Sequence, residues 1–163
     1  MRFGKTIGLL LTLATVMAPL QTLAQAESQA HPSTGLFTVL QQGTISAIDQ
    51  ERFEVIRNKP TFKSLWKQHN AAISPPPPLP NVDFSKDMVI AVFSGNKNTG
   101  GYVLNFDALE NRGDRLEAIL TLSQPGNQCM VAQVITAPFV IVKTRRTSLD
   151  VSVKLNTRTV DGC

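Results

Sequence analysis

The sequence predicts an all-β fold, mainly antiparallel, in which one short helix accompanies the strands. Residues 88–93 are all apolar, and so short an uninterrupted run is typical of a strand covered on both faces. Apolar and polar residues alternate over 149–156, as expected for a strand with one buried face. Turn-forming residues separate such segments at short intervals. This pattern favours a sandwich or a partly open barrel, with a β-rich α+β fold as the alternative.

The first residues have the features of a secretory signal peptide. Arg2 and Lys5 precede an apolar stretch over 7–18, and residues 24–26 (Ala-Gln-Ala) have the A-x-A pattern of a cleavage site. Pro19 ends the apolar stretch too soon for it to span a bilayer. The sequence therefore predicts a periplasmic or secreted protein with no membrane span after the signal is cleaved. The predicted segments are a signal peptide over 1–26, a flexible N-terminus over 27–35 and a single β-rich domain over 36–163.

The charge of the chain gives little reason to expect a nucleic-acid partner. The formal net charge is +4 at pH 7, and two of the positive charges, Arg2 and Lys5, leave with the signal peptide. Nucleic-acid binding usually requires a clustered basic face, for which the remaining charge is too mild. We therefore expect no nucleic-acid partner.

Two edge strands and one helix are predicted in the first half of the mature chain. The strands cover 36–40 and 51–56. Asn58 is suited to cap a helix and Pro60 to occupy its first turn, and the helix is expected to end near Asn70. Residues at positions i, i+3, i+4 and i+7 form one stripe on this helix. The stripe consists of Phe62, Leu65, Trp66 and His69, and Trp66 is interpreted as a core residue.

Proline dominates the segment over 74–80, which predicts a stiff polyproline II connector between the helix and the strand over 88–93. The segment also contains P-x-x-P, the pattern of an SH3 ligand. A spacer suits an exported chain better than such a ligand does.

A turn at Thr99, Gly100, Gly101 and Tyr102 is predicted to join the strand over 88–93 to the next strand in a hairpin. The polar residues and glycines of this turn permit positive φ and tight reversal. In the next strand, Tyr102, Leu104, Phe106 and Ala108 are expected to share one face. A second hairpin follows, with its turn at 110–114. The buried face of its second strand comprises Leu116, Ala118, Leu120 and Leu122.

The C-terminal part predicts three more extended segments, over 130–136, 139–142 and 149–156. Ala137 and Pro138 separate the first of these segments from the second. A proline inside a strand pattern indicates an edge position, a bulge or a crossing between sheets.

The two cysteines of the sequence, Cys129 and Cys163, are expected to form a disulfide in an oxidising compartment. Such a bond would hold the C-terminus against the loop at Gln128. The alternatives are two free thiols, or pairing of Cys163 with another molecule.

The sequence contains no recognisable catalytic or metal-binding motif. G-x-S-x-G, H-E-x-x-H and C-x-x-C are all missing, and the glycine-rich residues 96–101 join two strands rather than opening a helix. His31 lies in the predicted flexible start and His69 at a helix end, so a metal site is not expected. We therefore predict a protein that is not an enzyme and that needs no cofactor and no metal.

Three segments of the sequence resemble the C-terminal domain of the protease complex subunit PrcB family. They are residues 82–95, residues 99–102 (Thr-Gly-Gly-Tyr) and residues 137–143. The resemblance covers about 36–145, with its core at about 82–145, and is closest to small exported bacterial members. It implies a non-enzymatic domain whose partner is another exported protein, and a subunit that binds or stabilises a protease.

The Thr99 to Tyr102 turn is also similar to the N-P-T-T-G-[YF] loop of chagasin-type cysteine-protease inhibitors. This second resemblance implies an inhibitor that acts through the loop from Gly95 to Tyr102, because glycines let a loop enter a cleft and tyrosine gives contact area. A purely structural turn, with Tyr102 packed on the sheet, is the alternative. A small-molecule or glycan site between the sheets is a further alternative. The candidate partner-binding residues are Asn98, Thr99, Gly100, Gly101 and Tyr102.

Overall fold

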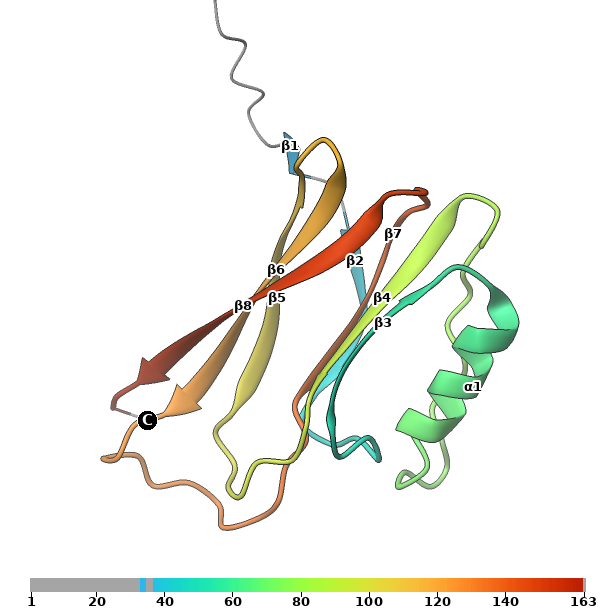
Figure 1. Cartoon of the computed structure of the whole chain (residues 1–163). Helices are drawn as coiled ribbons and strands as arrows, with labels where there is room; N and C mark the ends of the chain where they lie inside the picture. The colour runs from blue at the N-terminus through green and yellow to red at the C-terminus, as the bar shows by residue number, and fades with distance from the viewer. Residues whose placement is uncertain (1–32, 35–36, 163) are drawn as a thin grey trace, which may run out of the picture. The chain divides into compact units, whose positions relative to one another are not determined.

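The computed structural model describes residues 33–34 and 37–162 (Figure 1). The predicted signal peptide over 1–26 lies outside the described residues, as does Cys163. The strand β1 (Ser33–Thr34) falls within the predicted flexible segment over 27–35, whose other residues are not described.

The described residues form eight strands in two four-stranded sheets, together with one helix. We call the sheet with the order β2-β7-β4-β3 the helix-covered sheet and the sheet with the order β1-β5-β6-β8 the outer sheet. The predicted sandwich with one short helix is confirmed. The remaining elements are β2 (Phe37–Gly43), β3 (Glu51–Ile56), α1 (Lys59–His69), β4 (Asp87–Ser94), β5 (Val103–Asn111), β6 (Arg115–Pro125), β7 (Phe139–Arg145) and β8 (Asp150–Val160).

Two cores hold the three layers together. The helix-side core lies between α1 and the helix-covered sheet, and the inter-sheet core lies between the two sheets (Figure 1). Strand β4 belongs to both, because successive side chains of a strand point to opposite faces. Its residues over 88–93 are all buried, which confirms the strand predicted there. Val89, Ala91 and Phe93 face the helix-side core, and Met88, Ile90 and Val92 face the inter-sheet core.

The helix begins and ends where the sequence predicts. Asn58 is its N-cap, and the Asn58 side-chain oxygen accepts a hydrogen bond from the backbone N–H of Thr61 at 2.9 Å. Pro60 lies in the first turn and Asn70 is the C-cap. The predicted stripe packs on the sheet, since Phe62, Leu65, Trp66 and His69 are all buried.

The predicted hairpin between the strand over 88–93 and the following strand is wrong. β4 already has β3 on one edge and β7 on the other, so no edge remains for β5. β5 instead pairs with β6 in the outer sheet, and the loop over 95–102 crosses from one sheet to the other. The second predicted hairpin, between β5 and β6, is confirmed.

Strand β5 also departs from the predicted alternation. Its register against β6 shifts between Phe106 and Ala108. Because of this bulge Leu109, rather than Ala108, is buried in the inter-sheet core.

The strand predicted over 130–136 is not formed, apart from an isolated bridge between Lys97 and Thr136. The chain uses this segment to pass from β6 in the outer sheet to β7 in the helix-covered sheet. Of the three alternatives for Pro138, which were an edge position, a bulge and a crossing between sheets, the structure shows the crossing. The Pro138 carbonyl accepts hydrogen bonds from the backbone N–H of Ser94 at 2.9 Å and from the Ser94 hydroxyl at 3.0 Å.

His69 is buried at the C-terminal end of α1. Its Nδ1 lies 2.9 Å from Ser46 Oγ and its Nε2 lies 3.2 Å from Gln41 Oε1. The ring packs edge-on against Phe139, with 4.1 Å between the ring centroids. Burial disfavours the charged imidazolium and lowers the pKa of His69 from 6.5 to about 4.

We expect the protein to lose stability below about pH 6.5 in part through His69. Between pH 6.5 and the lowered pKa of about 4, the unfolded chain binds a proton at this residue that the folded chain does not bind. Lowering the pH from about 7 to about 4.5 should cost on the order of 2 kcal/mol of unfolding free energy from this source. Urea unfolding at several pH values measures this loss of unfolding free energy. His69→Gln should show a shallower pH dependence, and an unchanged slope would contradict the assignment.

Candidate functional site

Three loops meet at one end of the sandwich, the lower end in Figure 1. The first loop connects β2 to β3 (residues 44–50), the second connects β4 to β5 (residues 95–102) and the third connects β6 to β7 (residues 126–138). We call this surface the three-loop end. The loop over 95–102 contains the candidate residues chosen from the sequence.

Hydrogen bonds fix the second loop against the third. Lys97 and Thr136 exchange two backbone hydrogen bonds, of 2.7 Å and 3.0 Å. The backbone N–H of Gly100 donates to the carbonyl of Ala132 at 2.8 Å. The Thr136 hydroxyl donates to the carbonyl of Thr99, also at 2.8 Å. The Gly100 N–H and the Thr99 carbonyl of the candidate turn are therefore already occupied by contacts within the protein.

The first loop is joined to the other two. The N–H of Ala137 donates to the Thr44 carbonyl at 2.8 Å, and the N–H of Asn96 donates to the Asp49 carbonyl at 2.9 Å. All three loops are thus held to one another by backbone hydrogen bonds, so the three-loop end has a defined shape.

The candidate residues differ in what they can offer a partner. Tyr102 is half-buried and packs against the inter-sheet core, as in the structural alternative for this turn. Gly101 has a φ of +85° and lies so close to the third loop that a Cβ would stand 2.9 Å from Val131 Cγ1. Asn98 is exposed, and Thr99 and Gly100 are half-buried.

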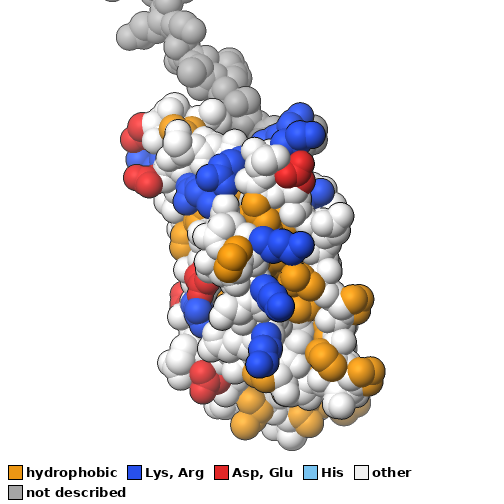
Figure 2. All heavy atoms as spheres, turned by 90° about the vertical axis from the view of Figure 1, so that its right-hand side faces the viewer, with side chains coloured by type: hydrophobic (Ala, Val, Ile, Leu, Met, Phe, Trp, Pro, Cys, Tyr) orange, Lys and Arg blue, Asp and Glu red, His pale blue; other side chains and the backbone are white. Residues whose placement is uncertain are grey.

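The sequence reasoning missed the large apolar side chains that project from the same end. Met130 is 95% exposed and Ile135 72% exposed, and Val134 and Ile45 are also exposed. Ile45 and Ile135 line one small hollow between the first and third loops. Figure 2 shows hydrophobic side chains gathered over the lower end of the molecule. An apolar segment that was expected to form a strand therefore lies open to solvent.

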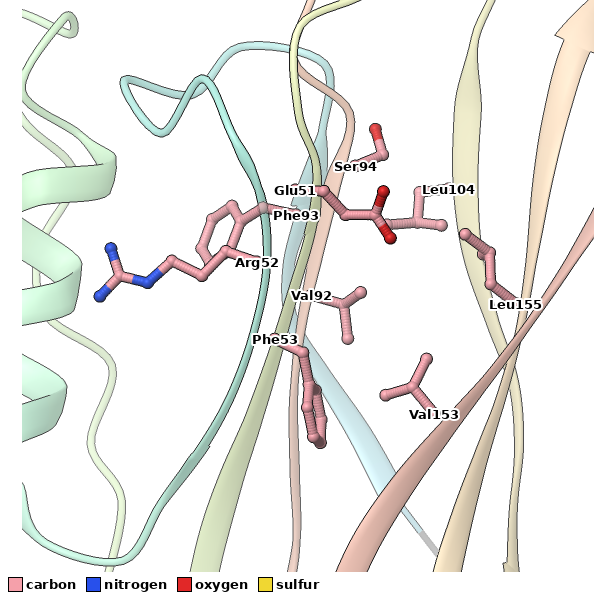
Figure 3. Close-up of a pocket in the computed structure, with 9 residues that line it drawn as sticks. All are labelled: Glu51, Arg52, Phe53, Val92, Phe93, Ser94, Leu104, Val153 and Leu155. Carbon is pink, nitrogen blue, oxygen red and sulfur yellow. The ribbon is translucent and has the colours of Figure 1, made fainter.

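A cleft between the two sheets bears on the alternative of a small-molecule or glycan site. It has a volume of about 390 Å³ and opens between the edge strands β3 and β8. Figure 3 shows apolar side chains directed into it, while the Glu51 carboxylate lies at one end and Arg52 points away. The apolar lining comprises Phe53, Val92, Leu104, Val153 and Leu155.

Two further observations concern only the residues that the structure describes. Among them, no three His, Cys, Asp or Glu side chains come together in a group that could hold a metal ion. No helix in this part of the chain combines the length and the apolar character needed to cross a membrane.

Cys129 lies at the start of the third loop, near the C-terminal end of β8. Its Sγ is 3.2 Å from the carbonyl oxygen of Val160. Because Cys163 is outside the described residues, the Cys129–Cys163 disulfide stays a prediction.

Replacing Cys163 by serine tests this disulfide. We expect Cys163→Ser to lower the melting temperature with the fold retained. A disulfide that closes a loop of this size reduces the conformational entropy of the unfolded chain, which stabilises the folded state by about 3–4 kcal/mol. Reduced wild-type protein should melt like the variant. Titration of two thiols in native, non-reduced protein would contradict the bond.

The neighbouring glycines of the turn provide a matched pair of substitutions. Gly101→Ala should cost at least about 1 kcal/mol of stability, because alanine disfavours positive φ and its Cβ would crowd Val131. Gly100→Ala should change stability by less than about 0.5 kcal/mol, since a Cβ there meets nothing closer than 3.5 Å. Urea unfolding of both variants measures the difference, and equal losses would contradict this account.

The central strands of the fold match a known protein family. Residues 88–145 match the family described as PrcB C-terminal, from the second residue of β4 to the last residue of β7. This segment contributes strands to both sheets and contains two loops of the three-loop end. No curated protein and no solved structure gives a match. The resemblance seen in the sequence is confirmed for this segment: residues 88–145 match the PrcB C-terminal family.

Proposed function

We propose that this chain is a non-enzymatic, exported subunit that binds another protein through the three-loop end, and that its partner is a protease. The observation that carries the proposal is the set of exposed apolar side chains on the first and third of these loops, of which Ile45 and Ile135 line one hollow. Exposed apolar surface that gathers in one place on a protein marks a site where another molecule binds. The exposed set comprises Ile45, Met130, Val134 and Ile135.

The hydrogen bonds among the loops support this choice of surface. Association costs free energy when flexible segments must be ordered in the complex. Here the bonds from Gly100 to Ala132 and from Ala137 to Thr44 hold the loops before any partner arrives. When the apolar side chains of this ordered surface are buried by a partner, more of the free energy of burial therefore appears as affinity.

The family match supports the type of partner. Two of the three loops lie within residues 88–145, the segment that matches PrcB C-terminal. The PrcB resemblance implies a subunit associated with a protease complex. The non-enzymatic part of the proposal comes from the sequence, in which the nucleophile, zinc and phosphate motifs are missing.

The inhibitor alternative differs in which residues would enter the partner. It relies on the loop from Gly95 to Tyr102. The Gly100 N–H and the Thr99 carbonyl of this loop are already hydrogen-bonded to the third loop. Met130 and Ile135 project from the third loop, so they are better placed to make the contact. An inhibitor would lower the activity of the captured protease, whereas a stabilising subunit would maintain it.

The test is a pull-down from the exported fraction with the mature chain as bait, followed by binding titrations with the captured protein. Ile135→Asp and Met130→Asp should each weaken binding at least tenfold, about 1.4 kcal/mol. Their melting temperatures should stay close to wild type, because both side chains are exposed.

The control is Asn156→Asp, which adds the same charge at an exposed position of β8. It should bind like wild type. If both loop variants also bind like wild type, the three-loop end is not the contact surface. If the captured proteins include no protease, the proposed partner is wrong.

A further inference from the structure

A second hollow lies between α1 and the proline-rich segment that follows it, and we call it the helix–proline groove. Its volume is about 610 Å³. Trp66, Ile73 and Leu79 give it an apolar lining, and Lys63 and Lys67 also border it. None of these residues lies in the three-loop end. The groove therefore requires its own explanation.

The wall of the groove is fixed by Trp66. This side chain is buried, and its Nε1 donates a hydrogen bond to the carbonyl of Pro77 at 3.0 Å. The bond ties the proline-rich segment to the helix. The groove is therefore held in shape in the free protein, as most ligand sites are.

Asn70 also lines the groove and is held in place by its own helix. The residue is 2% exposed, and its Nδ2 donates to the carbonyl of Trp66 at 3.0 Å. Its Oδ1 is buried and accepts no hydrogen bond from the residues that the structure describes.

The helix supplies a row of positive charge beside the groove. Lys59, Lys63 and Lys67 recur at every fourth position of α1, so they lie along one side of it, and all three are exposed. The helix contains no acidic residue, and within the described part of the chain none of these lysines forms an ion pair. Figure 2 shows Lys and Arg side chains following one another down this face with hydrophobic side chains beside them.

We propose that the helix–proline groove binds an extended acidic segment of a partner protein, with an apolar residue between two acidic ones. Lys63 and Lys67 are four residues apart on a helix, a rise of about 6 Å. Two residues of an extended peptide span about 6.6 Å, so acidic side chains at alternate positions match the two lysines. The apolar residue between them points the opposite way, toward Leu79 in the proline-rich segment.

This site lies outside the three-loop end, so it goes beyond the proposed function and can fail independently of it. An anionic membrane surface is the competing occupant. A membrane would engage Lys59 as strongly as Lys63 and Lys67, because all three lie on the same side of the helix. A peptide in the groove depends on Lys63 and Lys67, since Lys59 is not part of the lining.

The experiment uses the fluorescence of Trp66, the only tryptophan in the sequence, in the mature chain. The probe is an end-blocked peptide Gly-Glu-Leu-Glu-Gly, titrated up to about 1 mM, the weak end of specific affinity. We expect a saturable change in Trp66 emission. Two control peptides should bind at least tenfold more weakly. Gly-Glu-Ser-Glu-Gly lacks the apolar residue, and Gly-Lys-Leu-Lys-Gly lacks the acidic residues.

Charge-reversal variants place the binding site. Lys63→Glu and Lys67→Glu should each weaken binding of the acidic peptide at least fivefold, whereas the matched control Lys59→Glu should stay within twofold of wild type. Thermal melts confirm that the variants are folded. The proposal is overturned if the peptide leaves the emission unchanged, or if Lys59→Glu weakens binding as much as the other two. It is also overturned if only phosphatidylglycerol vesicles, and no peptide, change the emission.

Discussion

The structure depends on the complete burial of β4. Both faces of this strand are covered, one by the helix-side core and one by the inter-sheet core, and both of its edges are paired. A strand in this position can accept no further neighbour. The chain that follows must leave the sheet, so the loop over 95–102 crosses to the outer sheet. The return from β6 to β7 crosses back at the same end, and the two crossings brace each other through Lys97 and Thr136.

The helix is required by the same constraint. β4 and β7 present apolar residues to both sides, and α1 covers the side that the outer sheet does not reach. Its last turn carries His69 into this core among Trp66, Phe93 and Phe139. The proline-rich segment then runs back to β4 and is held to the helix by the Trp66 hydrogen bond. The helix–proline groove is the space that remains between a cylindrical helix and this stiff segment.

Local signals in the sequence predicted the elements well, and long-range pairing could not be read from them. The cap at Asn58 and the apolar run over 88–93 reflect the immediate neighbours of each residue, so α1 and β4 were predicted correctly. The partner of β5 depends on which edges of β4 are free, which no local pattern records. Gly100 and Gly101 are a local signal too, and they correctly indicated a loop at the candidate site. Val134 and Ile135 were misread because apolar residues in a row look the same whether they are buried or exposed.

The pairing of β2 with β7 has a consequence for how the chain acquires its structure. Phe37 lies opposite Thr144, so one edge of the helix-covered sheet joins residues from opposite ends of the domain. The last strand, β8, closes the outer sheet by lying parallel to β6. Contacts of such high sequence separation slow folding, because a long loop must close before they form. A chain emerging from its N-terminus therefore holds β2 without its partner until β7 has been synthesised, and the outer sheet lacks an edge strand until β8 follows.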